Sequence, residues 1–247
     1  MLTRYADDPS APTVRQWARD VLERAVAPAL ALFAGIVALG MVIGGPLAGL
    51  TAEDGINRSI QAGRTPAWDA VTGVWSRVGN TEIVIGVCVL AVALLWWRTR
   101  QWWYAVIPAI AISLQASVFV SATAITGRER PDVEHLDPAP PTSSYPSGHM
   151  GASTALYLTL GVMARRIEHA WVRRLATAVC VVIPLLVGYA RIYRGMHHVS
   201  DVVVGAVNGI VCTALAWLAV RRVGPGRPTD ALGRPARPGT TRPETVP

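Results

Sequence analysis

The sequence predicts an all-α membrane protein, a polytopic bundle of six helices. About half of the 247 residues are hydrophobic, and they lie in long blocks rather than in alternating patterns. Three of these blocks, residues 25–52, 105–125 and 202–220, contain no charged residue. Each is long enough to cross a hydrocarbon core of roughly 30 Å as an α-helix.

Six spans are expected in chain order, at residues 27–49, 80–97, 104–126, 148–165, 173–191 and 200–220. The second, fourth and fifth have only 15 or 16 uncharged residues at their centres, so their assignment also depends on their polar flanks. The first block is too long for the apolar part of a cleaved signal peptide, and we interpret it as a retained helix.

Polar segments flank the predicted membrane domain, which covers residues 25–222. Residues 1–24 are polar and are expected in the cytoplasm. Residues 223–247 combine six prolines with scattered arginines and show no apolar periodicity. This composition is typical of a disordered tail.

The segment between the first two spans contains one short apolar pattern. Trp68, Val71, Trp75 and Val78 are spaced three and four residues apart, as on one face of a helix. Such a helix could lie on the membrane surface. We expect instead that its apolar face packs on the end of the bundle.

The basic residues predict the orientation in the membrane. All of them are arginines; with a cytoplasmic N-terminus, 16 fall on the inner side and seven on the outer side. This bias places both termini in the cytoplasm. Six tryptophans near the predicted inner boundary fit an aromatic belt: Trp96, Trp97, Trp102, Trp103, Trp171 and Trp217.

The remaining composition excludes other classes of partner. A net charge of +7 could indicate nucleic-acid binding in a soluble protein, but here the arginines lie between apolar blocks and follow the topology. Cys88, Cys180 and Cys212 each lie alone in an apolar block, without metal-ligand spacing. No nucleic acid, metal or cofactor is therefore predicted.

Three polar clusters fall on the predicted outer face, where they would meet at the ends of different spans. In chain order they are Gly127-Arg128-Glu129-Arg130-Pro131, Pro146-Ser147-Gly148-His149, and the set Arg191, His197 and Asp201.

The second cluster has the features of an anion site. Ser147 precedes an apolar run and is a natural N-cap, and the free N–H groups of a helix N-terminus attract anions. Gly148 would let a ligand approach the backbone, and His149 would stand beside it. Taken alone, the pattern is better explained by an ordinary capped helix with a surface histidine.

The third cluster has the spacing of an oriented imidazole. His197 and Asp201 are four residues apart, so on a helix they share a face. A carboxylate on one ring nitrogen leaves the other as a directed nucleophile or base. A histidine that is merely satisfied by its neighbour is the alternative. His198 is expected on the surface near lipid head groups, and the acidic residues around His135 are expected in solvent.

The combination is more specific than its parts. Arginine forks suit phosphate oxygens, and charges near a bilayer are costly and usually functional. Order and spacing resemble the three-part motif of the type 2 phosphatidic acid phosphatase and haloperoxidase superfamily, which reads Lys-x6-Arg-Pro, Pro-Ser-Gly-His and Ser-Arg-x5-His-x3-Asp. Here the lysine position holds Thr123 and the serine before Arg191 is Ala190. Arg128 is nearby and is expected to replace the lysine.

The resemblance implies a metal-independent lipid phosphatase with its site on the outer face of a bacterial plasma membrane. By that resemblance His197 attacks phosphorus, Asp201 orients it, and His149 acts as acid and then base. Arg130, Arg191, Ser147 and Gly148 hold the phosphoryl oxygens, together with Arg128.

The expected substrate is a lipid phosphate or diphosphate, first undecaprenyl diphosphate and second phosphatidic acid or phosphatidylglycerol phosphate. Two other classes stay open. A vanadium haloperoxidase shares the motif but is typically soluble, and a non-catalytic lipid carrier would fit the change at Thr123. The sequence assigns no oligomeric state.

Overall fold

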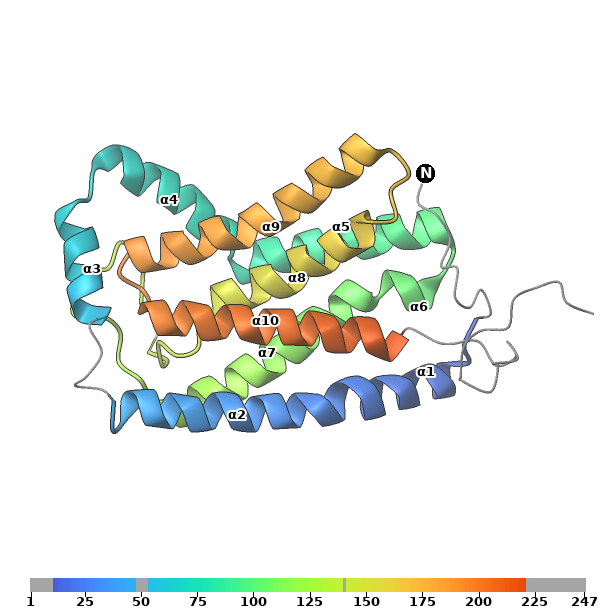
Figure 1. The fold of residues 1–247 in the computed structure, drawn as a ribbon, viewed down its shortest axis with the longest axis horizontal. Helices are drawn as coiled ribbons and strands as arrows, with labels where there is room; N and C mark the ends of the chain where they lie inside the picture. Colours follow the sequence, from blue (N-terminus) through green and yellow to red (C-terminus); the bar gives the residue numbers. More distant parts are fainter. Residues whose placement is uncertain (1–10, 48–52, 140, 221–247) are drawn as a thin grey trace, which may run out of the picture.

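The computed structural model describes residues 11–47, 53–139 and 141–220, and its elements are helices. They are α1 (Val14–Val21), a π-helical turn η1 (Leu22–Val26), α2 (Ala27–Gly44), α3 (Glu53–Ala62), α4 (Pro66–Val78), α5 (Thr81–Thr99), α6 (Trp102–Ala105), α7 (Ile107–Thr126), α8 (Gly148–Ala164), α9 (Ala170–Tyr193) and α10 (Val199–Val220). The long helices run side by side in an elongated bundle (Figure 1), as the all-α prediction required. The predicted tail lies outside the described residues.

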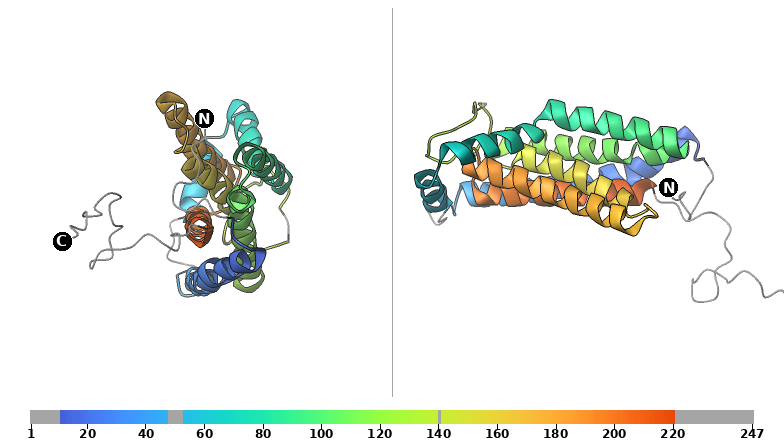
Figure 2. Two further views of the ribbon diagram at one scale, coloured as in Figure 1. Left: turned by 90° about the vertical axis from the view of Figure 1, so that its right-hand side faces the viewer. Right: turned by 90° about the horizontal axis from the view of Figure 1, so that it is seen from above.

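Five of the six predicted spans are long and apolar enough to cross a membrane. These are Val14–Gly44, Thr81–Thr99, Trp102–Thr126, Ala170–Tyr193 and Val199–Val220. The remaining span is the fourth in chain order and corresponds to α8, which has only 17 residues and is mostly buried. It packs against α7, α9 and α10 in the middle of the bundle (Figure 2). That α8 also crosses the membrane stays a prediction.

The first span begins well before its predicted start at residue 27. Thr13 caps α1 through a capping box with Gln16, so the helix starts at Val14 and continues through η1 into α2. The boundary expected after residue 24 is therefore not a break in the chain's structure.

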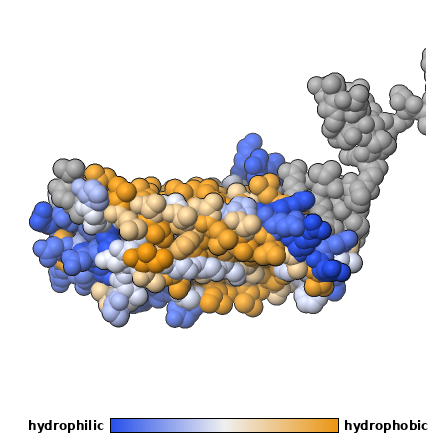
Figure 3. Space-filling view, turned by 90° about the horizontal axis from the view of Figure 1, so that it is seen from below, coloured by the Kyte–Doolittle hydropathy of each residue, from blue (hydrophilic) through white to orange (hydrophobic). Residues whose placement is uncertain are grey.

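The surface of the bundle fits a lipid environment. A hydrophobic band covers the face shown in Figure 3, between hydrophilic ends. Large apolar side chains such as Leu30 on α2, Val89 on α5 and Leu185 on α9 are exposed on the bundle. Exposed apolar surface on this scale marks an interaction site in a soluble protein; on these helices it faces the bilayer.

Glycines bring α8 and α10 into close contact. A Cβ added to Gly209 of α10 would lie 2.6 Å from the carbonyl oxygen of Gly151 in α8, and one added to Gly205 would lie 2.5 Å from the carbonyl oxygen of Ser147. Small residues spaced four apart let membrane helices approach in this way. The close approach brings the first residues of the two helices together, and Ser147 N–H donates to the Asp201 carbonyl at 2.9 Å.

Helices α3 and α4 lie at one end of the bundle (Figure 1), where α4 contacts α9. The apolar stripe on α4 packs on the bundle only in part: Val78 packs against the buried cluster that includes Val84 and Leu156, whereas Trp68 and Val71 are 51% and 45% exposed. The buried residues of α4 are instead Thr72 and Ser76. The prediction therefore holds for only part of the stripe, because the end of the bundle also offers polar partners: Arg194 donates to Thr72 and Arg191 to Ser76.

Candidate active site

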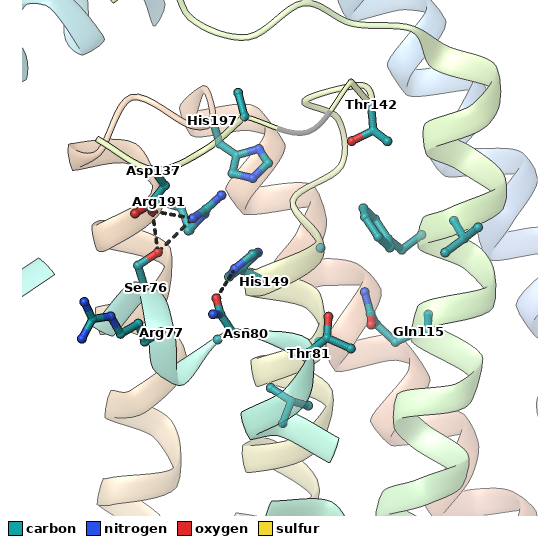
Figure 4. Close-up of a pocket in the computed structure, with 18 of the residues that line it drawn as sticks. Ser76, Arg77, Asn80, Thr81, Gln115, Asp137, Thr142, His149, Arg191 and His197 are labelled. Atoms are coloured by element: carbon teal, nitrogen blue, oxygen red, sulfur yellow. Dashed lines mark hydrogen bonds and ion pairs between the residues drawn. The ribbon is translucent and has the colours of Figure 1, made fainter. Parts of the chain in front are cut away.

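The three polar clusters meet at the end of the bundle that carries α3 and α4. A cavity of about 860 Å³ opens there between α5, α7, α8 and α9. Five of the predicted site residues line it: Arg130, Gly148, His149, Arg191 and His197. Figure 4 shows His149, Arg191 and His197 turned toward one another around this space.

His197 lies just before α10, in the short loop that follows α9, rather than on the helix as expected. Its Nδ1 is 2.7 Å from the carbonyl oxygen of Ser144 and 3.8 Å from Oδ2 of Asp201. Because a carbonyl oxygen only accepts, Nδ1 carries the proton and Nε2 keeps its lone pair. The nearest orienting group is therefore Ser144, which the spacing argument missed because every residue has a carbonyl.

Asp201 is fully buried at the start of α10 and does not line the cavity. Its Oδ2 accepts from the backbone N–H of His198 at 2.8 Å, which caps the helix. Its Oδ1 forms an ion pair with Nη1 of Arg128. Asp201 therefore acts on His197 as a neighbouring negative charge on the side away from the cavity.

Arg128 does not take the place expected for the missing lysine. It is not among the residues that line the cavity, and it binds Asp201, Oε2 of Glu53 at 2.8 Å and Oγ of Ser200 at 2.7 Å. Two carboxylates already neutralise its guanidinium, so the expectation that Arg128 binds phosphate does not fit this geometry. The arginines that line the cavity are Arg77, Arg130 and Arg191.

Arg130 is held beside His197 by the backbone. Its Nη1 donates to the carbonyl oxygen of Met196 at 2.8 Å. Burial lowers the pKa of Arg130, and the charge of Asp201 opposes this effect. An arginine remains protonated under these conditions, so Arg130 brings a positive charge to the edge of the cavity.

His149 stands on the first turn of α8 and is held by a residue that the sequence did not single out. Its Nε2 is 3.0 Å from Oδ1 of Asn80, at the start of α5 (Figure 4). The amide oxygen accepts, so Nε2 carries a proton and Nδ1 is free to gain or lose one. Asn80 precedes a helix and would be taken for a cap, but its side chain makes no capping bond.

The start of α8 departs from the expected anion site. Ser147 is the N-cap residue, yet its side chain makes no capping bond, and it is fully buried away from the cavity lining. Gly148 does line the cavity, but a Cβ there would meet the ring of Phe119 at 2.6 Å. A side chain at position 148 would therefore have to displace the Phe119 ring.

Two expectations about neighbouring residues were wrong. His198 is buried, with Nε2 3.2 Å from Asp54 and Nδ1 3.3 Å from Asp201, because the loop before α10 turns it inward. Asp137 is not a solvated loop residue. It forms ion pairs with Arg191 and Arg194, and although burial acts to raise its pKa, hydrogen bonds from Arg194 and Ser76 hold that pKa below the usual value.

Among the described residues, no group of three histidine, cysteine or carboxylate side chains gathers in a way that could bind a metal ion. The ionisable groups that line the cavity are two imidazoles, three guanidinium groups and the carboxylate of Asp137.

Comparison with known proteins identifies the class. Residues 102–225 match the model of the PAP2 superfamily, which is half of the chain, and the protein belongs to this family. The fold and family together define a membrane enzyme, a metal-independent lipid phosphatase. A search among curated proteins found no match.

Two solved structures share the fold. One is the first transmembrane PAP2-type phosphatidylglycerolphosphate phosphatase from Bacillus subtilis, with a TM-score of 0.67, 21% identity, and coverage of 76% of this chain and 94% of that one. The other is LpxE of Aquifex aeolicus, with a TM-score of 0.54, 24% identity, and coverage of 68% and 95%.

The environment of His197 predicts the pH dependence. Burial lowers the pKa of His197, and this effect is partly offset by Asp201. The neutral imidazole, which is the form that can attack, therefore persists at pH values below about 6.5, the usual pKa of histidine. Single-turnover formation of a phosphoenzyme should therefore hold its rate as the pH falls to 6.5 and decline only below it. The midpoint should be the same for two substrates whose phosphates have different pKa values. A midpoint above 6.5 that is independent of substrate would contradict the assignment.

Proposed function

We propose that the protein hydrolyses a lipid phosphate or diphosphate at the outer surface of a bacterial plasma membrane, through a phosphohistidine on His197. The observation that supports this most is the composition of one cavity. Its polar part includes His149, Arg191 and His197. An apolar part of its wall is formed by Val84 and Ile85 of α5, Ile112, Phe119 and Val120 of α7 and Ala152 of α8. An amphiphile with a phosphate head matches both parts.

In the proposed reaction, Nε2 of His197 attacks phosphorus while Nδ1 keeps its proton and donates it in a hydrogen bond to the Ser144 carbonyl oxygen. The bond between phosphorus and the lipid oxygen breaks, and His149 protonates the departing oxygen. Arg130 and Arg191 stabilise the charge on the phosphoryl oxygens.

Water then completes the cycle. A water molecule attacks phosphorus and gives a proton to His149. The bond between Nε2 of His197 and phosphorus then breaks and orthophosphate is released. The hydrogen bond between His149 Nε2 and Asn80 can form in both protonation states of the ring, so it holds the imidazole in one orientation through both steps.

Two substrates rank first. Undecaprenyl diphosphate fits an outward-facing site, since an isoprenoid carrier is recycled on that side. Phosphatidylglycerol phosphate is favoured by the name of the Bacillus subtilis structure that shares the fold. The residues that line the cavity support the head-group chemistry common to both.

The orientation of the protein in the membrane is supported by the distribution of arginines. It is also supported by the tryptophans at the end of the bundle opposite the cavity. Trp96, Trp97 and Trp171 lie at that end and are more than half exposed. Exposed tryptophans at a helix boundary are typical of a membrane interface. The cavity then opens on the extracytoplasmic side.

Topology can be tested with single cysteines. With the native cysteines replaced, a cysteine at Ala139 should react with a membrane-impermeant maleimide in intact cells, because the α7–α8 loop is outside. A cysteine at His169, in the exposed α8–α9 turn, should react only after lysis. Labelling of the second position and not of the first in intact cells would reverse the orientation.

Activity should appear as phosphate release in detergent from undecaprenyl diphosphate or phosphatidylglycerol phosphate, and much less from water-soluble glycerol phosphate. It should survive EDTA, because the proposed reaction uses imidazole and guanidinium groups and no group of three metal-ligating side chains gathers among the described residues. His197→Ala should serve as the inactive control. Specific lipid binding without turnover would favour the non-catalytic carrier. Loss with EDTA and recovery with magnesium would contradict the mechanism.

The two histidines should differ in acid-quench labelling. His197→Ala should form no phosphoenzyme with any substrate, because the nucleophile is absent. His149→Ala should still form one from p-nitrophenyl phosphate, whose leaving group needs no proton, and the intermediate should accumulate because its hydrolysis needs the same imidazole. A labelled phosphoenzyme in His197→Ala would refute the assignment of the nucleophile.

A further inference from the structure

Arg191 is held on one side by two residues outside the three clusters. Its Nη1 donates to Oγ of Ser76 at 2.9 Å and to Oδ2 of Asp137 at 2.8 Å. Ser76 closes the triangle by donating to the same Oδ2 at 2.8 Å. Ser76 comes from α4 and lies before residue 102, where the match to the family model begins.

Asp137 is itself fixed from the other side. Its Oδ1 lies 2.8 Å from Nη2 of Arg194, which also donates to the carbonyl of Leu136, and Nη1 of Arg194 donates to the carbonyl of Asp69. The Asp137 carboxylate is therefore bound through both oxygens, so its orientation does not depend on Arg191. It holds the guanidinium of Arg191 in one position.

The opposite edge of Arg191 is left for a ligand. Its Nε is buried and has no hydrogen-bond partner among the residues that the structure describes. Figure 4 shows the guanidinium between Ser76 and Asp137 on one side and His197 on the other. A buried N–H without a partner is costly, and the edge formed by Nε and Nη2 is the fork that binds two phosphate oxygens.

We propose that Asp137 and Ser76 are positioning residues, which turn the Nε edge of Arg191 toward the phosphoryl group at His197. This inference rests on the proposed function. A free arginine side chain samples many rotamers, and fixing it before the substrate arrives removes that entropic cost from binding. A neutral residue at position 137 would lose the ion pair that holds Nη1 of Arg191.

The opposite role makes the opposite prediction. If the Asp137 carboxylate occupied the place of a phosphoryl oxygen, it would compete with the ligand. Its neutralisation would then tighten the binding of phosphate-like anions. The direction of the change separates the two roles.

Vanadate, a phosphoryl mimic, is the probe. Asp137→Asn and Ser76→Ala should raise its dissociation constant, measured by calorimetry, and Asp137→Asn should lower kcat/KM by roughly ten-fold or more, the loss typical of a hydrogen bond to a charged group. Asp132→Asn is the matched control, because Asp132 is an exposed carboxylate of the same loop, and it should behave as wild type. Unchanged or tighter vanadate binding in Asp137→Asn overturns the proposal.

A double-mutant cycle tests the route through Arg191. If Asp137 acts by positioning Arg191, then Asp137→Asn should have little further effect on vanadate binding in an Arg191→Ala background. Arg191→Lys, which keeps the charge without the fork, replaces Arg191→Ala should that variant not fold. Additive losses overturn the proposal. A wild type that hydrolyses no lipid phosphate refutes the proposed function, whereas the vanadate cycle on the same protein still decides the role of Asp137.

Discussion

The buried carboxylate of Asp201 is the interaction on which the rest of the site depends. It is completely enclosed at the start of α10, where it accepts from the backbone of His198 and forms an ion pair with Arg128. A buried ion is expensive unless its partners are well placed, and removal of one partner of a buried pair typically costs about 3–5 kcal/mol. Arg128 reaches on to Glu53, so the α7–α8 loop, α10 and α3 are joined through one charge network.

This network and the glycine contacts explain why the two histidines share a cavity. The carbonyl of Asp201 accepts from Ser147, which fixes the start of α8 against the start of α10. Gly205 and Gly209 allow the backbones to come that close. His149 follows Ser147 and His197 precedes α10, so two residues 48 positions apart in sequence come to face one space.

The cavity has an apolar part within the bundle and a charged part at the bundle end, as expected for a protein in a membrane. Apolar side chains of α5 and α7 form the wall within the bundle, and the charged groups lie at its polar end. Helix α4 completes that end by turning Thr72 and Ser76 inward, while Trp68 and Val71 of its apolar stripe stay exposed. Ser76 binds Arg191, and Asn57 of α3 donates to the carbonyl of His197, so the segment between the first two spans takes part in the site.

The sequence by itself determined the helical class, the positions of the long spans and the family. These properties are carried by runs of apolar residues and by fixed spacings, which are local along the chain. The same spacings singled out Arg130, His149, Arg191 and His197, and these four residues line one cavity.

Only the tertiary structure decided which partners those residues have. It assigned Arg128 to Asp201 instead of to the cavity, gave Ser144 and Asn80 the task of orienting the two imidazoles, and paired Asp137 with Arg191. No spacing predicts these contacts, because they join elements that meet only when the helices pack. A backbone carbonyl or a loop carboxylate looks the same in sequence whether it faces water or a buried guanidinium, and it is burial that gives each contact its strength.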